Sequence, residues 1–169
     1  MINEKMAKAL NEQINKEFYS SYLYLQMAAY FEEMGLKGFA NWMKVQAQEE
    51  NTHAHKFYNY LLDRGGKVVL ETIQKPEDDF KSVIDVFERV LNHEVYVTSL
   101  INSLMDVAEE LKDRASMSFL KWFIDEQVEE EANCEDIIAQ LKIVDCSGDA
   151  LFMMDREMAQ RVFVDNTQN

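Results

Sequence analysis

Four long stretches of the sequence carry apolar residues at alternating steps of three and four, the spacing of one buried face of an α-helix. Each stripe also has a glutamate near its centre, where a packed core favours Leu or Val. Because these glutamates lie near mid-helix, they would meet at one level of a bundle whichever way each helix runs. The four stripes are Leu10, Ile14, Glu17, Ser21, Tyr24, Ala28 and Phe31; Phe39, Met43, Gln46, Glu50, His53, Phe57 and Leu61; Val83, Phe87, Val90, Glu94, Val97, Ile101, Leu104 and Ala108; and Phe119, Phe123, Glu126, Glu130, Asn133, Ile137 and Leu141.

Glycine and proline residues divide the chain into helical segments. Gly35 and Gly38 bracket one break, residues 65–66 and Pro76 mark a second, and Gly148 marks a third. The predicted helices are near 3–33, near 38–64, two within 77–147, and a short amphipathic one near 149–160.

The stretch 77–147 contains neither Gly nor Pro, yet it cannot be one helix. Such a helix would span roughly 105 Å and could not pack along its partners. We therefore place a turn at the polar cluster 110–113, with Asp113 as the N-cap of the following helix.

Loop lengths predict the topology. The first and third connections are short, so each joins an antiparallel pair. The second connection, from Gly65 to about Phe80, can span roughly 50 Å if extended. The predicted helix before it, near 38–64, is about 40 Å long, so this connection can run the full length of the bundle. Helices two and three can therefore run parallel. The prediction is an all-α four-helix bundle (about 3–144) with one long crossover, a short fifth helix (about 149–160) and a frayed tail at 165–169, forming a single domain over 1–169.

Composition narrows the classes of function. The net charge of −14 disfavours a nucleic-acid or anionic membrane surface, and no apolar run approaches a signal peptide or a membrane span. Two cysteines, Cys134 and Cys146, do not make a disulfide framework or a four-cysteine zinc site. We expect a cytoplasmic protein with both thiols reduced.

Carboxylates gathered in a dry core repel one another and lose hydration. No Lys or Arg lies on the four stripes, so the acids must either hold protons or be neutralised by cations. Two divalent ions balance five glutamates better than one, and carboxylates with one imidazole suit iron or manganese better than structural zinc. The converging groups are Glu17, Glu50, Glu94, Glu126, Glu130 and the imidazole of His53.

Several of these side chains also have a purely structural interpretation. His53 alone would be an ordinary core histidine, but Glu50 three positions earlier on the same face favours a ligand. His55 and His93 fall off the stripes and are expected at the surface. Tyr24 is either core packing or a hydrogen-bond and electron donor to the site.

The chain resembles the non-haem ferritins of bacteria and archaea over nearly its full length. The segments that carry the resemblance are 10–13 with Glu17, the Tyr-rich run 19–24, 47–50 with His53, 93–94, and 119–122 leading into 126–131. The resemblance implies a ferritin-like fold, the fold of the di-iron carboxylate bundles. It also implies a ferroxidase that oxidises Fe(II) with dioxygen or hydrogen peroxide and stores ferric mineral in a shell of 24 subunits.

Carried over by position, the resemblance implies a di-iron centre. Glu17, Glu50 and His53 would bind the first iron. Glu94 and Glu130 would bind the second, with Glu50 bridging and Gln127 nearby. A third iron site would use Glu49, Glu126 and Glu129 together with Glu130. Apart from the resemblance, the acidic run 129–131 is expected to be in part a solvated face, with Glu131 as its solvent-facing member.

The sequence also departs from related branches. Asn133 stands where a second Glu-x-x-His would end, Thr52 lies near the haem-ligating Met of bacterioferritins, and there is no Cys-x-x-Cys, so no haem is expected. Met117 and Leu120 fall where animal ferritins line their threefold channels with acids, so that route for iron does not carry over.

Three functions follow as hypotheses. The leading one is an iron-storage ferroxidase, the alternative is a non-storage di-iron redox enzyme, and the third is a helical interaction module with protonated core acids. Apolar residues off the main stripes favour subunit contacts and thus a homo-oligomer. They are Phe18, Tyr22, Leu25 and Ala29 in the first helix and Leu151, Phe152 and Met158 in the fifth.

Overall fold

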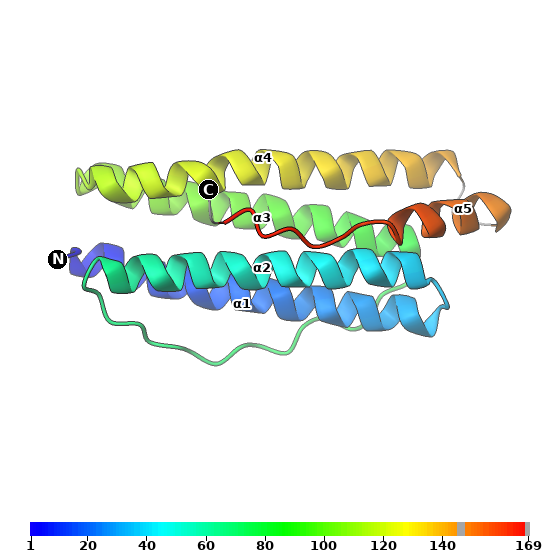
Figure 1. Ribbon diagram of the computed structural model, residues 1–169, viewed down its shortest axis with the longest axis horizontal. Coiled ribbons are helices and arrows are strands. Elements are labelled where there is room, and N and C mark those ends of the chain that lie inside the picture. The colour runs from blue at the N-terminus through cyan, green and yellow to red at the C-terminus, as the bar shows by residue number, and fades with distance from the viewer. Residues whose placement is uncertain (145–147, 168–169) are drawn as a thin grey trace.

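The computed structural model describes residues 1–144 and 148–167 and contains five helices in those ranges. They are α1 (Glu4–Glu33), α2 (Lys37–Asp63), α3 (Val83–Glu110), α4 (Arg114–Ile143) and α5 (Gly148–Met158). The first four lie side by side, with α1 packed on α2 and α3 on α4, and α5 lies at one end of the bundle (Figure 1). The predicted four-helix bundle with a short fifth helix is confirmed. Cys146 lies outside the described residues.

Side-chain caps fix where three of the helices begin. Asn3 accepts from the backbone N–H of Lys5 at the start of α1. Asp113 accepts from that of Ser116, which confirms its predicted role as the N-cap of α4. Ser82 caps α3, so that helix begins at Val83, slightly later than predicted.

The crossover between α2 and α3 runs the length of the bundle along its outside (Figure 1). Asn11 of α1 holds it with two hydrogen bonds, donating to Lys67 O at 3.0 Å and accepting from Val69 N at 2.7 Å. Helices α2 and α3 therefore run parallel, as the length of the connection predicts.

Helix α5 packs on the start of α2. Leu36, the residue before α2, offers no side-chain cap, and Asp155 of α5 supplies one instead. Asp155 Oδ1 accepts from Gly38 N at 2.8 Å and Phe39 N at 3.0 Å. The two backbones are so close that a Cβ on Gly38 would lie 1.5 Å from the Asp155 carbonyl oxygen, so only glycine fits.

Residues 159–167, here called the C-terminal strap, return from α5 along the bundle (Figure 1). Asn41 Nδ2 donates to Arg161 O at 2.9 Å, and Lys56 Nζ donates to Thr167 O at 2.5 Å, so α2 holds the strap near both of its ends. The prediction of a frayed tail is therefore wrong for 165–167, while 168–169 lie outside the described residues.

The buried face of α4 is offset from the predicted stripe. Glu126 is only half-buried and Asn133 is exposed, whereas Gln127 and Cys134 point into the core. The two registers share Glu130, so the offset leaves its predicted position intact.

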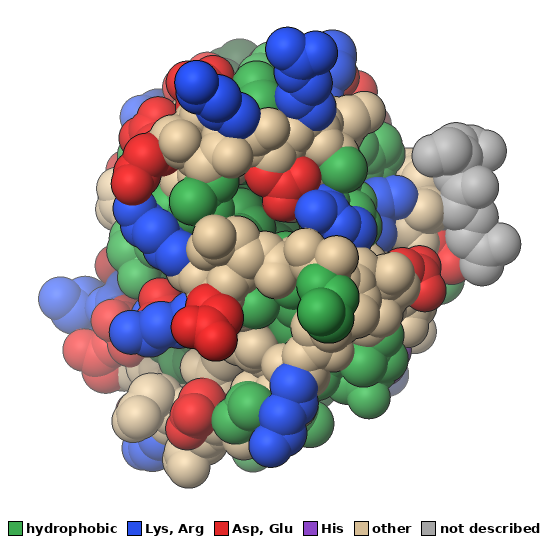
Figure 2. All heavy atoms as spheres, turned by 90° about the vertical axis from the view of Figure 1, so that its left-hand side faces the viewer, with side chains coloured by type: hydrophobic (Ala, Val, Ile, Leu, Met, Phe, Trp, Pro, Cys, Tyr) green, Lys and Arg blue, Asp and Glu red, His purple; other side chains and the backbone are tan. Residues whose placement is uncertain are grey.

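The core consists of two apolar clusters with a polar layer between them. One cluster contains Phe31, Phe39 and Phe87, and the other contains Leu10 and Phe57. No helix in the described residues is long and apolar enough to cross a membrane. At the end of the bundle where α1 begins, basic, acidic and apolar side chains intermingle (Figure 2).

Candidate metal centre

One half of the polar layer is a three-residue cluster from α1 and α2. Glu17, Glu50 and His53 each offer a ligand atom within 4.8 Å of the others, and all three are at most 4% exposed. His53 Nδ1 lies 3.5 Å from Glu50 Oε2. Its ring packs edge-on against Trp122 and Phe123, with centroids 5.4 and 5.9 Å away, which fixes the imidazole toward the acids.

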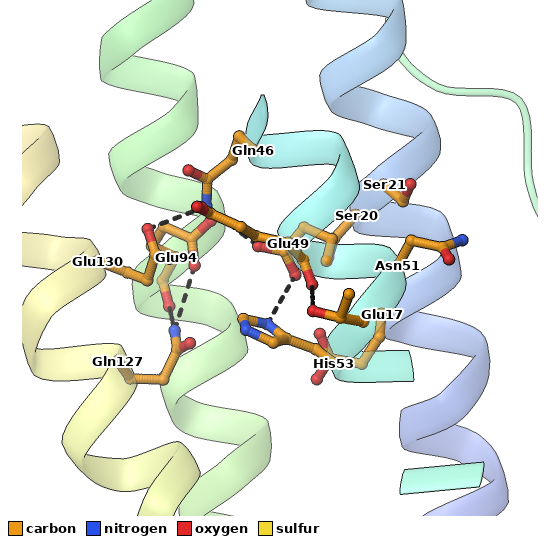
Figure 3. A network of polar contacts seen from close by, with 12 residues as sticks. Glu17, Ser20, Ser21, Gln46, Glu49, Asn51, His53, Glu94, Gln127 and Glu130 are labelled. Carbon is orange, nitrogen blue, oxygen red and sulfur yellow. Dashed lines mark hydrogen bonds and ion pairs between the residues drawn. The ribbon is translucent and has the colours of Figure 1, made fainter. Parts of the chain in front are cut away.

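The other half comes from α3 and α4. Glu94 and Glu130 are buried and point toward the first cluster (Figure 3). Gln127 Nε2 donates to Glu94 Oε2 at 3.2 Å, and the Tyr24 hydroxyl donates to Glu94 Oε1. Tyr24 is therefore a hydrogen-bond partner of the site and not only core packing.

Two glutamines complete the layer, and the sequence did not identify them as site residues. Gln46 Nε2 donates to Glu50 Oε1 at 3.2 Å and to Glu130 Oε2 at 2.9 Å, so one amide joins the two halves. Gln13 Nε2 donates to Glu17 Oε1 at 2.6 Å. The available signal was spacing, because each glutamine precedes its glutamate by four positions on the same helix face.

Burial raises the pKa of all four core glutamates, Glu17, Glu50, Glu94 and Glu130, to about 8. For each of them the next largest cause is the charge of a neighbouring glutamate. The metal-free centre therefore holds protons at neutral pH, and a cation that binds there must displace them.

The donors fit a divalent cation. Glu17 Oε2 is buried and has no hydrogen-bond partner within 1–144 and 148–167. In the same ranges no Lys or Arg forms an ion pair with Glu17, Glu50, Glu94 or Glu130. A cage of carboxylates and one imidazole without a basic partner offers the hard ligands that iron takes.

The four acids of the expected third site are not brought together in the same way. Glu130 belongs to the cage, but Glu49 is half-buried and forms an ion pair with Arg161. Glu126 is half-buried and Glu129 is exposed. Glu129, and not Glu131, is the solvent-facing member of the run, because Glu131 is half-buried and accepts a hydrogen bond from Thr98.

The remaining histidines differ from each other. His55 is exposed, as expected. His93 is not a simple surface residue, because its Nε2 lies 2.8 Å from Ser20 Oγ and its ring packs edge-on against Tyr24 at 6.1 Å. Burial lowers the pKa of His93 to about 4, so the ring is neutral at physiological pH.

Leu120 is completely buried within the bundle, and Met117 is half-buried. Leu120 therefore packs the core and does not line a surface channel.

Comparison with known proteins places this architecture in a family. Residues 7–144 match the family model described as ferritin-like domain. A bacterial non-heme ferritin of Bacteroides fragilis is 43% identical over 162 residues, covering 95% of this chain and 100% of the relative. One of Staphylococcus saprophyticus is 41% identical over 163 residues, covering 96% and 98%.

Solved structures agree with these relatives. An engineered closed form of the Archaeoglobus fulgidus ferritin superposes with a TM-score of 0.96 at 47% identity, covering 97% of this chain and 100% of that one. The open pore ferritin of the same organism gives a TM-score of 0.94 at 47% identity, covering 96% and 100%. The chain therefore belongs to the ferritin family, and it resembles the bacterial and archaeal non-haem members along nearly its whole length.

Proposed function

We propose that this protein is an iron-storage ferroxidase, with Fe(II) as its substrate. The observation that carries the proposal is the buried cluster of Glu17, Glu50 and His53 facing Glu94 and Glu130. Among the described residues, no Lys or Arg forms an ion pair with any of these four acids. The names of the relatives, which are ferritins, support the storage role.

The cage divides naturally into two iron positions. Glu17, Glu50 and His53 would hold the first ion, and Glu94 and Glu130 the second. Glu50 is the natural bridge, because the Gln46 amide already links its carboxylate to that of Glu130. The Gln127 and Gln46 amides would satisfy carboxylate oxygens that face away from a metal.

The proposed reaction removes one electron from each of two Fe(II) ions. Dioxygen takes up both electrons with two protons and becomes hydrogen peroxide, or peroxide takes up two electrons and two protons and becomes two waters. Closely spaced carboxylates stabilise Fe(III) over Fe(II), because the higher charge offsets more of their repulsion. The Tyr24 hydroxyl, which donates a hydrogen bond to Glu94 Oε1, would orient that carboxylate toward the second ion.

We further propose that the chain is a single ferritin-like domain that assembles as a cytoplasmic shell of 24 subunits. Apolar side chains that an isolated subunit leaves exposed support assembly. Tyr22 and Leu25 on α1 are 52% and 47% exposed, and Phe152 on α5 is 61% exposed. Met158, expected in the same role, is instead buried.

Rapid mixing of Fe(II) with dioxygen tests the reaction. Glu50→Ala should slow oxidation by ~100-fold or more, because it removes the group shared by both positions. Glu88→Ala, at an exposed site on α3, is the control and should oxidise iron normally. Unchanged kinetics in Glu50→Ala would refute the site assignment.

The alternative is a di-iron redox enzyme without a storage role. Light scattering and iron loading separate the two functions. A particle near half a megadalton that loads hundreds of irons supports storage, whereas a small oligomer that turns over without loading supports redox catalysis. No Fe(II) binding at all would leave the helical interaction module.

A further inference from the structure

The C-terminal strap carries a cation, Arg161, that contacts an acid beside the metal centre. Arg161 Nη2 donates to Glu49 Oε2 in an ion pair, and its Cζ lies 4.3 Å from the centroid of the Trp42 ring. Only about a fifth of each side chain of the ion pair is exposed. Stacking on an aromatic face and pairing with a carboxylate are the two contacts that suit a guanidinium best.

Contacts hold the backbone on both sides of Arg161 in the chain. Asn41 Nδ2 donates to the backbone carbonyl oxygen of Arg161. Before Arg161 in the chain, Asp155 accepts from Gly38 N and so attaches α5 to the start of α2. Downstream, Lys56 holds Thr167. Arg161 Nη1 is buried without a hydrogen-bond partner in the described part of the chain, so the ion pair with Glu49 and the Trp42 ring are the contacts that stabilise the guanidinium.

A second cation also contacts the strap. Lys56 Nζ donates to Thr167 O at 2.5 Å and lies 4.4 Å from the centroid of the Trp122 ring. The ion pair of Arg161 is the contact that bears on a third iron, because Glu49 is one of the acids that the ferritin resemblance assigns to that ion.

A metal ion bound to Glu49 would lie beside a guanidinium that is already bonded to that carboxylate. The ion would have to displace the guanidinium or share the carboxylate with a like charge. Glu129, another acid assigned to that ion, is exposed, and the cluster of possible metal ligands in the described residues joins Glu17, Glu50 and His53 without it. The residues therefore do not fit a third metal ion while the strap is docked.

We propose that Arg161 is a built-in cation that occupies the place of the third metal ion, so that each subunit binds two ions and not three. The inference rests on the proposed function only in taking the two positions of the cage as given. On this proposal, Arg161 sets the number of metal ions that each subunit binds. A third ion can bind only when the strap is released.

Metal counting tests this inference. Calorimetric titration with Zn(II), which is redox-inert, and anaerobic dialysis with Fe(II) should both give two ions per subunit in the unaltered protein. Arg161→Gln should gain a third site, bound roughly 10- to 100-fold more tightly than any third ion in the unaltered protein, because a charge-assisted contact no longer competes. Arg161→Lys keeps the charge and should remain at two.

Two further variants serve as controls. Arg156→Gln removes the same charge from an exposed position on α5 and should leave the count at two. Glu49→Gln should also leave it at two in the unaltered background, but should abolish the third site in the Arg161→Gln background.

Three tightly bound ions in the unaltered protein would overturn the inference without any variant, as would a count of two in a folded Arg161→Gln protein. Failure of every variant to bind even two ions would instead refute the cage itself.

Discussion

At the scale of single residues, Gln46 does more than fill space between the two halves of the cage. Its amide nitrogen contacts Glu50 and Glu130 at once, and both of these side chains are buried. In the metal-free protein this amide satisfies two carboxyl groups that water cannot reach. Bound metal would take over part of that role.

Gln46→Met therefore should destabilise the metal-free protein by about 1–3 kcal/mol, because the volume is kept while buried acceptors lose their donor. The loss should shrink when Zn(II) fills the cage. Thermal unfolding in EDTA and in Zn(II) measures both effects, and Gln48→Met, at an exposed position on the same helix, is the control. An equal loss in both conditions would show that Gln46 acts only through packing.

At the scale of elements, α5 and the strap depend on one close approach. Gly38 touches the backbone of Asp155, and Asp155 caps α2. A side chain at position 38 would push α5 away, and the strap with it, while the antiparallel pairs of long helices keep their contacts.

Gly38→Ala should accordingly raise hydrogen exchange in α5 and in 159–167, with little change within α1–α4, and lower stability by about 1–3 kcal/mol. Asp155→Ala removes the cap without adding volume and should give the same pattern. Asp149→Ala, an exposed acid at the start of α5, should not. Exchange that rises evenly over the whole bundle would contradict this coupling.

The elements also show what the sequence could predict. Apolar periodicity and Gly and Pro positions are enough for the helices and the crossover, because both follow from local spacing and loop length. The predicted stripe of α4 is only partly confirmed. Phe123, Glu130, Ile137 and Leu141 are buried, but Glu126 and Asn133 are not. Apolar residues stand next to each other at Phe119 and Leu120 and around Phe123, so two faces fit the period almost equally. The strap could not be predicted, since Asn41 and Lys56 hold its backbone carbonyls, which leave no side-chain pattern.

The residues of the candidate site also differ in whether a local sequence pattern indicates them. The expected ligands could be identified because an ionisable side chain breaks an apolar stripe. They are Glu17, Glu50, His53, Glu94 and Glu130. Gln46 and Gln13 are polar without charge and break the stripe less visibly. The pairing of Glu49 with Arg161 joins positions 112 residues apart, and no local pattern indicates it.

At the scale of the whole molecule, a layer of buried acids lies between two apolar clusters, so its protonation affects the stability of the entire bundle. The pKa of Glu17, Glu50, Glu94 and Glu130 is about 8 in the folded protein, compared with 4.5 for a free glutamate. The folded protein thus binds more protons than the unfolded chain between these values. The contribution of these four acids to the free energy of unfolding is fully present below about pH 4.5, and it is lost as the pH rises toward 8.

His93 gives the free energy of unfolding the opposite dependence on pH. Its pKa falls from 6.5 to about 4 on folding, so its contribution is present above 6.5 and is lost as the pH falls toward 4. In EDTA, the melting temperature should therefore drop by several degrees between pH 7 and pH 8.5, where the four acids dominate because His93 is largely neutral in both the folded and the unfolded chain. Saturating Zn(II) should remove or reverse that drop, because cations replace the protons. Scanning calorimetry across this range decides the matter, since a metal-free melting temperature that rises toward pH 8.5 would mean that the four carboxyl groups are already ionised in the folded bundle.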